Sequence, residues 1–361
     1  MDNSIKMIPY TACYANKRIY FLDGKSRFIY GFDYVENRVR LIKKIYDIEQ
    51  GYGYFNIRVS EDALYMMPDT SDKFVAYDFI NENCVDIEYD AKGNEGEKTH
   101  RKIGLLQSFL HNKQLIGIPV DFDRIFTINV IEKSLCCTPL SAKQQNMDSI
   151  IAYGSGSIVD EKIYLPAYGQ KLICEIDIPD MEVLYRHVSI KGGLSSLCIN
   201  NKEIFAVDVC GEKLYGISRD DWSVEEYPLE LPCDFKQSSH NSNTPQVFIG
   251  CVEYKKHMWL IPYYSANGVL CYELSSKKLE RHITFSMCDI YTYVVENEKL
   301  LLCTSNGLVE ISMENGEVKE YLLTLDKIDN KEYLNEYFDS KDLVQEDKVN
   351  LCHMIEYLSN Q

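Results

Sequence analysis

Small polar side chains recur at one position ahead of each apolar run in this chain. Seven such runs begin at Ile19, Leu64, Leu115, Ile163, Ile204, Met258 and Leu300. Counting back eight residues from each gives Thr11, Asn56, Gln107, Ser155, Ser196, Gly250 and Thr292. Amides and hydroxyls gathered around one opening can hold water, an ion or a polar ligand. The alternative is that polar residues simply begin strands.

Carboxylates follow several of the same apolar runs, at Asp23, Asp69, Asp121, Asp123 and Asp208. Facing carboxylates can hydrolyse a glycosidic bond or bind a hard cation. Asp at the end of a strand also begins Asx turns, so both interpretations stay open. An enzyme acting on carbohydrate, a glycosidase or a lyase, would use the last four of these residues.

A cation lies just before the next apolar segment in five repeats, at Arg27, Lys73, Arg124, Lys171 and Lys213. On an acidic protein this repeated positive edge could bind a carboxylate or a phosphate, or the cations could be solvated turn residues. His240 lies in a long polar insertion and is the histidine best placed for proton transfer, although a solvated loop histidine is the alternative. We expect Arg27, Arg124 and the His240 loop to face the same opening as the polar residues.

Metal and cofactor motifs are missing from the sequence. The seven histidines show no HxH or HExxH spacing, and no cysteine lies at metal-site spacing from them. There is no GxGxxG, no P-loop and no GxSxG. The sequence therefore predicts neither a metal nor a cofactor.

The repeated apolar runs define the elements that must position these residues. Their spacing is 41 to 54 residues, and each repeat reads as four short strands with turn residues between them. A period of this length built of short strands is typical of a propeller. We predict seven four-stranded antiparallel blades, with residues 11–14 in the innermost and residues 39–45 in the outermost strand of the first blade.

The repeat Glu161-Lys-Ile-Tyr-Leu-Pro-Ala, with its copies at Lys17-Arg-Ile-Tyr-Phe-Leu-Asp and Lys256-His-Met-Trp-Leu-Ile-Pro, resembles the repeats of β-propeller proteins. The similarity is to degenerate kelch-like or quinoprotein-like repeats and covers residues 10–323. It implies the all-β propeller fold and leaves the function open, because propellers carry many functions.

Composition narrows the partners and the compartment. The formal net charge of -17 argues against nucleic acid and against an anionic membrane surface. No apolar run has the length of a membrane span or, in the first 20 residues, of a signal peptide. Thirteen cysteines, an odd number without a CxxC pair, predict reduced thiols and a cytoplasmic protein.

The C-terminal residues follow another pattern. We predict that the propeller spans residues 1–323 and that residues 324–361 form a helical tail, because apolar residues recur there at helical spacing: Leu334, Tyr337, Phe338, Val349, Cys352, Ile355 and Leu358. The tail could cap the propeller or dock a partner protein.

These observations favour a cytoplasmic binding or scaffold propeller that recognises a polar small molecule, a glycan or a protein at the face of its channel. The alternative is the carbohydrate-active enzyme described above. In a third hypothesis, the propeller is a rigid platform and the C-terminal tail is the functional part of the protein.

Overall fold

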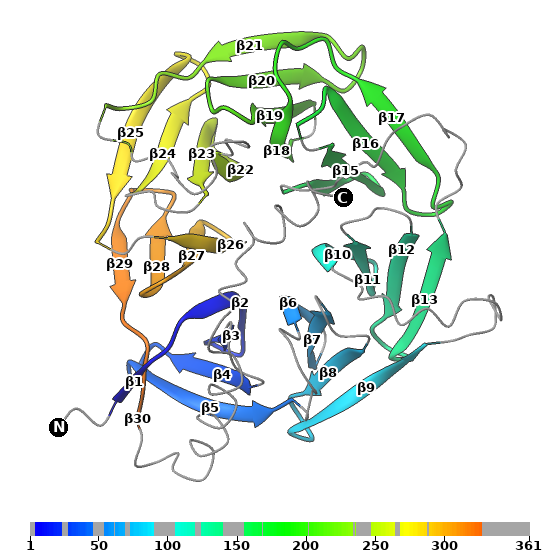
Figure 1. Cartoon of the computed structure of the whole chain (residues 1–361), viewed down its shortest axis with the longest axis vertical. Coiled ribbons are helices and arrows are strands. Elements are labelled where there is room, and N and C mark those ends of the chain that lie inside the picture. The colour runs from blue at the N-terminus through cyan, green and yellow to red at the C-terminus, as the bar shows by residue number, and fades with distance from the viewer. Residues whose placement is uncertain are drawn as a thin grey trace, which may run out of the picture.

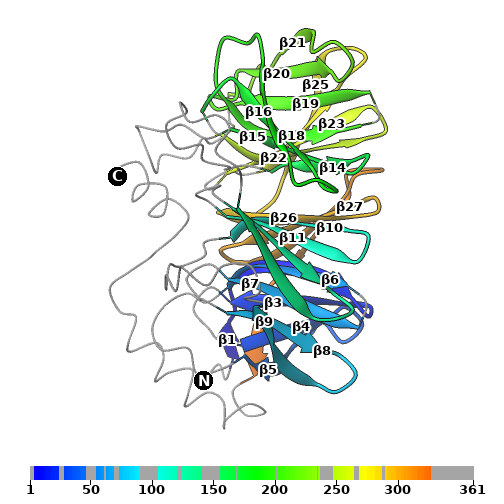
Figure 2. The ribbon, with the colours of Figure 1, turned by 90° about the vertical axis from the view of Figure 1, so that its right-hand side faces the viewer.

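The computed structural model of the chain describes residues 4–23, 28–45, 54–60, 62–68, 73–89, 105–119, 124–139, 155–167, 169–200, 202–233, 235, 247–263, 268–286 and 289–326. Within these ranges the chain forms seven four-stranded antiparallel meanders around a central axis (Figure 1). Figure 2 shows the same ring edge-on. The predicted seven-bladed β-propeller is confirmed.

The strands of each blade run in chain order from the centre outward. Blades 1 to 3 consist of β2 (Pro9–Ala15), β3 (Arg18–Asp23), β4 (Phe28–Asp33) and β5 (Arg38–Lys44); β6 (Tyr54–Ser60), β7 (Ala63–Pro68), β8 (Phe74–Asp78) and β9 (Asn83–Tyr89); and β10 (Leu105–His111), β11 (Gln114–Pro119), β12 (Arg124–Asn129) and β13 (Ser134–Pro139). As predicted, residues 11–14 lie in the innermost strand of blade 1, and β5 is its outermost strand.

Blades 4 to 7 repeat this order. They consist of β14 (Ser157–Val159), β15 (Lys162–Pro166), β16 (Leu172–Asp177) and β17 (Val183–His187); β18 (Leu194–Ile199), β19 (Glu203–Asp208), β20 (Lys213–Ser218) and β21 (Val224–Pro228); β22 (Phe248–Tyr254), β23 (His257–Pro262), β24 (Gly268–Glu273) and β25 (Lys278–Thr284); and β26 (Ile290–Glu296), β27 (Lys299–Thr304), β28 (Gly307–Ser312) and β29 (Val318–Tyr321).

Turn chemistry explains why the chain reverses where it does. The first two strands of four blades are joined through a pair of residues with positive φ, such as Asn16 (49°) and Lys17 (61°), as a type I′ hairpin requires. The turn between the third and fourth strands contains a residue with positive φ in every blade: Asn37, Glu82, Lys133, Met181, Trp222, Lys277 and Gly316. These short turns keep consecutive strands paired within one blade.

The hydrophobic core is divided among the boundaries between blades. Seven clusters of buried side chains each combine residues from two neighbouring blades, so every boundary has its own cluster. The residues that begin the apolar runs are the centre of this packing, because all seven of them, from Ile19 to Leu300, are 0% exposed. Burial of the repeated apolar positions therefore holds one blade against the next.

The ring is closed by a ribbon that the sequence does not predict. Strand β1 (Ser4–Lys6) pairs antiparallel with β30 (Thr324–Asp326), and the Met7 amide donates to the Leu323 carbonyl at 2.9 Å. These three residues of β30 fall in the range predicted for the helical tail, yet they form a strand because their partner is supplied by the other end of the chain. The rest of the predicted tail lies outside the described residues.

Two blades also share an edge. The outermost strands β9 and β13 pair in parallel at Ser134 with Glu88 and at Leu135 with Tyr89, which joins blades 2 and 3 into one eight-stranded sheet. Among the described residues there is no helix long and apolar enough to cross a membrane.

Candidate functional site

The predicted polar residues occupy one register on the innermost strands. Thr11, Asn56, Gln107, Ser196 and Thr292 each follow a β-bulge and pair with the same position of the second strand, as Thr11 does with Leu22 and Asn56 with Met67. Gly250 occupies the same place opposite Ile261, and Ser155 lies just before β14. We call this set the polar level. A bulge re-aims the side chain beside it, and six of the seven blades use one here.

The side chains of the polar level reach toward the following blade. The Asn56 Oδ1 accepts a hydrogen bond from the Ser108 hydroxyl (3.3 Å), and the Gln107 Oε1 accepts one from the Gly156 amide (2.8 Å). Ser196 is fully buried, and its hydroxyl donates toward the Cys251 sulfur at 4.0 Å. The structure thus brings these residues to a common level, where the contacts of these three cross the boundary between blades.

Arg58, on β6, is the charged group at the centre of this arrangement, and sequence reasoning missed it. Its Nε donates to the Ser108 hydroxyl (3.1 Å) and to the Ser108 carbonyl (3.3 Å), and its Nη2 donates to the same carbonyl (3.2 Å). Ser108 belongs to β10 of blade 3, so the guanidinium crosses the same kind of boundary. Within the described ranges, Arg58 forms no ion pair with a carboxylate.

Burial changes the electrostatics around Arg58. The Arg58 side chain is partly buried, and this desolvation lowers the pKa of the guanidinium, whereas the neighbouring Cys13 and Tyr293 oppose that shift. Cys13 lies on β2 of blade 1 and Tyr293 on β26 of blade 7, so the groups that influence this cation belong to blades other than its own. Burial also raises the pKa of Cys13 to about 12 and raises the pKa of Tyr293. Both groups are therefore neutral hydrogen-bond donors near pH 7.

Two further features belong to this centre. Among the described residues, the buried Ser155 hydroxyl oxygen has no partner at hydrogen-bond geometry. It nevertheless lies close enough to Tyr293 to lower the pKa of that phenol against the effect of burial. A Cβ at Gly250 would lie 2.3 Å from the Tyr293 ring, so glycine is the residue that leaves room for this phenol. Ser155 itself is fixed by its carbonyl, which accepts from the Leu197 amide at 2.8 Å.

A comparison of equivalent positions could have found Arg58 in the sequence. It lies six residues before the apolar run of its blade, where the other blades have Cys13, Phe109, Ser157, Cys198, Val252 and Val294. A single cation in a set of otherwise neutral residues is the signal. Its burial depends on seven strands meeting at one axis, which the sequence pattern alone does not show.

Some of the other predicted site residues are described by the structure and some are not. Arg27, His240, Asp69, Asp121 and Asp123 lie outside the described residues. Arg124 begins β12, is partly buried and pairs with Pro139. Thr11 is 4% exposed, and Thr292 is partly buried.

Asp208 has the role that the turn interpretation predicts. Its Oδ1 accepts from the Glu212 amide (2.8 Å) and from the Lys213 amide (3.2 Å). Burial raises the pKa of this carboxyl, and the two amides oppose the increase. The described part of the chain contains no group of three or more His, Cys, Asp or Glu side chains that could hold a metal ion.

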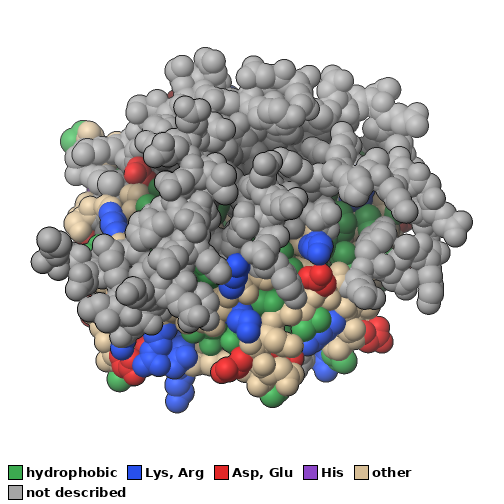
Figure 3. All heavy atoms as spheres, turned by 60° about the horizontal axis from the view of Figure 1, so that its bottom comes forward, with side chains coloured by type: hydrophobic (Ala, Val, Ile, Leu, Met, Phe, Trp, Pro, Cys, Tyr) green, Lys and Arg blue, Asp and Glu red, His purple; other side chains and the backbone are tan. Residues whose placement is uncertain are grey.

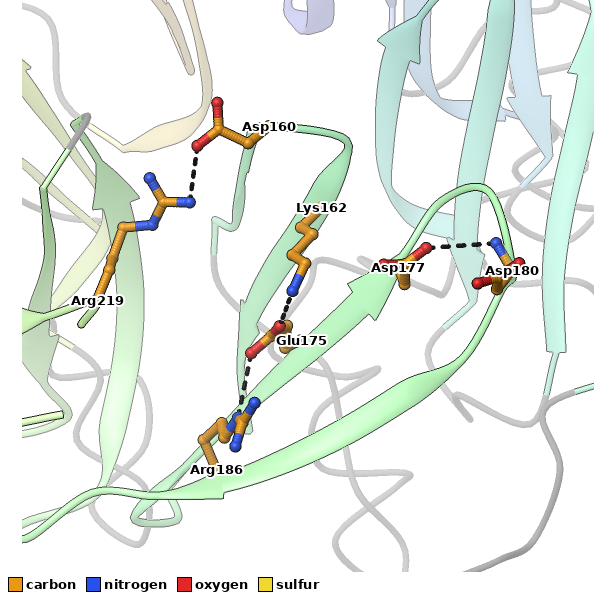
Figure 4. Close-up of polar contacts among 7 residues, drawn as sticks. All are labelled: Asp160, Lys162, Glu175, Asp177, Asp180, Arg186 and Arg219. Carbon is orange, nitrogen blue, oxygen red and sulfur yellow. Dashed lines mark hydrogen bonds and ion pairs between the residues drawn. The ribbon is translucent and has the colours of Figure 1, made fainter. Parts of the chain in front are cut away.

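Other buried charges are compensated within the protein. Glu175 lies between Lys162, whose Nζ is 2.5 Å from Oε1, and Arg186, whose Nε is 3.1 Å from Oε2 (Figure 4). Nearby, Arg219 of blade 5 contacts Asp160 of blade 4 at 2.9 Å. On the described part of the surface in Figure 3, cationic and acidic side chains lie next to one another. Arg58 differs from these charges because its partners are neutral.

No protein-family model and no curated protein matches the chain. Among solved structures it is similar to virginiamycin B lyase from Staphylococcus aureus, with a TM-score of 0.61 and 10% identity over 85% of this chain and 97% of that one. It is also similar to the WD40 β-propeller domain of Doa1 (TM-score 0.57, 9% identity, 84% and 92% of the two chains). A third similar structure is the extracellular domain of a hybrid two-component system from B. thetaiotaomicron (TM-score 0.58, 11% identity, 84% and 38%). These similarities establish the propeller fold and nothing more.

Proposed function

We propose that this propeller is a binding protein that holds an anionic group of its ligand in the central channel, with Arg58 as the anchor. The observation that carries the proposal is the partly buried guanidinium of Arg58, which among the described residues has hydrogen bonds to Ser108 and no carboxylate partner. A charge taken out of water is costly unless an opposite charge compensates it. An anion bound in the channel supplies that charge.

The geometry of the guanidinium leaves a suitable edge for such an anion. Nε and one Nη2 hydrogen face Ser108, so Nη1 and the second Nη2 hydrogen form the outer edge of the planar group. That edge matches the two oxygens of a carboxylate or a phosphate. The buried Ser155 hydroxyl, which has no hydrogen-bond partner among the described residues, and the nearby Tyr293 phenol are neutral donors for the same ligand.

The residues around Arg58 favour binding over catalysis. A nucleophile or general base needs a pKa near the working pH, whereas burial raises the pKa of Cys13 to about 12 and also raises that of Tyr293. The alternative, an enzyme acting on carbohydrate, rests on Asp69, Asp121, Asp123 and Asp208. Of these, the described residues include Asp208, whose carboxylate accepts hydrogen bonds within its own turn.

Removal of the cation tests this proposal. We expect acetate and inorganic phosphate to raise the melting temperature of the protein, because a ligand that binds the folded state stabilises it by mass action. Arg58→Gln should abolish this increase, and Arg58→Lys should weaken it because Lys lacks the planar fork. Arg40→Gln removes an exposed arginine of β5 and should leave the response unchanged. A full response to both anions in Arg58→Gln would refute the proposal.

A second measurement keeps the proposal testable if the variant changes stability. In buffer without small anions, Arg58→Met removes an uncompensated cation together with its bonds to Ser108. These effects oppose each other, so the free energy of unfolding should stay within about 1 kcal/mol of the parent value. A loss of about 3 kcal/mol or more would show that the cation is already compensated within the protein.

A further inference from the structure

Along the channel, the inner strands carry polar side chains on one side of Arg58 and mostly apolar side chains on the other. We call the end where the first and second strands of each blade are joined, as at Asn16 and Lys17, the hairpin end. The polar level lies away from it. Nearest to it are the residues that pair directly with the start of each apolar run: Tyr14, Val59, Leu110, Ile158, Ile199, Glu253 and Val295. We call this set the apolar collar.

Six of the seven collar residues are apolar or aromatic, although they are not fully buried. Leu110 is 42% exposed and Val295 is 39% exposed, and Val59, Ile158 and Ile199 are partly exposed. Glu253 is the acidic member, and its Oε1 accepts from the Lys256 amide at 2.8 Å within its own turn. Partly exposed aliphatic side chains therefore recur around the inner strands at this end.

The level of Arg58 itself, one position from the collar, holds further apolar residues. Phe109, Val252 and Val294 occupy the positions equivalent to Arg58 in their blades, and all three are partly buried. The guanidinium itself is held at the next level, because Ser108 precedes Phe109 on β10. Phe109, Val252 and Val294 also pack against the clusters between blades, as do Tyr14, Val59, Ile158 and Ile199 of the collar. Leu110 and Val295 are therefore the most exposed apolar members of the collar. From the hairpin end inward, the described inner strands thus carry apolar residues first and a cation second.

We propose that the ligand held by Arg58 is an amphipathic carboxylate that enters from the hairpin end. Its carboxylate binds the outer edge of the guanidinium, and its apolar body lies against the collar and the Phe109 level. This inference rests on the proposed function and adds the chemical class of the ligand. An aliphatic body gains free energy by covering partly exposed Leu110 and Val295, as it does when any apolar surface leaves water.

The opposite orientation is disfavoured by the polar level. Asn56 and Gln107 accept hydrogen bonds from Ser108 and Gly156 of the next blade, and an apolar body placed among these polar atoms would remove less apolar surface from water than one placed against the collar. The gain in free energy is roughly proportional to the apolar area removed from water. The channel therefore distinguishes the two ends of an amphipathic ligand.

Ligand series test the inference on the full chain. Acetate, butyrate and octanoate should bind with affinities that rise about three- to fourfold for each methylene buried. Octan-1-ol, which has the chain without the charge, should bind at least about tenfold more weakly than octanoate. Equilibrium titration calorimetry, with competition for the weakest ligands, measures all four.

Substitutions in the collar distinguish binding of the ligand's apolar chain from binding of its carboxylate. The double variant Leu110→Asn, Val295→Asn should weaken octanoate at least about tenfold and leave acetate within about twofold. The matched control Val35→Asn, Ile80→Asn changes two residues that are 95% and 72% exposed in turns away from the inner strands, and should change neither affinity.

The possible failures are distinguishable. If acetate and octanoate bind equally and both require Arg58, the proposed function stands and the amphipathic ligand is refuted. If octanoate binds tightly and Arg58→Gln does not weaken it, the cation is not the anchor and both proposals fall. If the collar variant weakens acetate as strongly as octanoate, the collar supports the fold of the site and does not contact the ligand body, which also refutes the inference.

Discussion

At the residue scale, this protein buries charge in two ways. Glu175 is 5% exposed and lies between two cations that are themselves partly exposed, so its charge is compensated within one blade. Arg58 is partly buried, and in the described part of the chain its hydrogen bonds go to the neutral Ser108 of the next blade. A compensated charge contributes to the stability of the fold, whereas an uncompensated one provides a binding site for the opposite charge.

Glu175→Gln should show the first case. Burial alone would raise the pKa of Glu175, but hydrogen bonds from Lys162 and Arg186 outweigh burial and lower it below the ordinary 4.5. A carboxyl with a lowered folded-state pKa stabilises the protein above its unfolded pKa, and this contribution disappears as pH falls through the folded value. The variant should lose about 1–2 kcal/mol at pH 7.

Urea denaturation of both proteins at pH 7 and at acid pH checks this prediction. The difference between parent and variant should shrink as the pH falls below 4.5, because the parent carboxyl then becomes protonated. Glu182→Gln, an exposed change in the same blade, should have little effect at either pH. A difference that grows toward acid pH would contradict the assignment of the lowered pKa.

Thiol chemistry gives a second prediction at this scale. Cys13 and Cys174 are buried, and burial raises the pKa of each to about 12, so they should be unreactive in the native protein at pH 8. Cys136 and Cys233 are exposed and should react quickly. After denaturation without reductant, a thiol-specific reagent should recover nearly all thirteen cysteines. Recovery of only a few would contradict the predicted reducing compartment.

At the scale of elements, polar contacts beside the channel join blade 2 to blade 3, blade 3 to blade 4, and blade 5 to blade 6. The contacts follow one rule. Each polar-level residue contacts the following blade at the residue that comes directly after that blade's own polar-level residue. Asn56 with Ser108, Gln107 with Gly156 and Ser196 with Cys251 all obey it. Gly250 of the polar level likewise faces Tyr293, which comes directly after Thr292 in the following blade, at a distance that leaves no room for a Cβ.

Gln107→Ala should therefore lower stability. The substitution removes the acceptor of the Gly156 amide, which lies in a short stretch before β14, and an amide left without a partner in the protein interior costs about 1–3 kcal/mol. Guanidinium denaturation should show this loss, whereas Gln114→Ala, at an exposed position of the neighbouring strand β11, should change stability by less than about 0.5 kcal/mol. Equal effects of the two variants would show that the contact between blades contributes nothing.

At the scale of the whole molecule, the ring depends on the pairing of the two ends of the described chain. Strands β1 and β30 pair beside blade 1, and Leu323 and Leu325 enter the same hydrophobic cluster as residues of blades 7 and 1. A propeller whose first and last blades separate would expose the cluster between them. Closure of the ring is therefore a packing interaction as well as a hydrogen-bonded one.

Leu325→Ala measures this closure. Leu325 is 4% exposed, and its truncation should cost about 2–5 kcal/mol, as for other buried leucines. Leu322→Ala is the matched control three residues earlier, because Leu322 is 60% exposed and should lose less than about 0.5 kcal/mol. Thermal denaturation followed by circular dichroism compares the two. A Leu325→Ala protein as stable as the control would mean that the ribbon does not hold the ring together.

The sequence by itself determined the local features of this protein. The number of blades, the order of strands within a blade and the buried positions that begin each apolar run follow from alternation, turn residues and a period of 41 to 54 residues, because each depends on neighbours along the chain. The shared register of Thr11, Asn56 and Gln107 follows for the same reason.

Only the tertiary structure decided which of these residues meet. Arg58 and Ser108 are fifty residues apart in the sequence, and β1 and β30 lie at opposite ends of the described chain. Such contacts depend on how far each blade twists and on how the ring closes, which no local pattern encodes. The same convergence of inner strands partly buries Arg58 beside Ser108 of the next blade, and so makes one cation in a repeated position the candidate binding site.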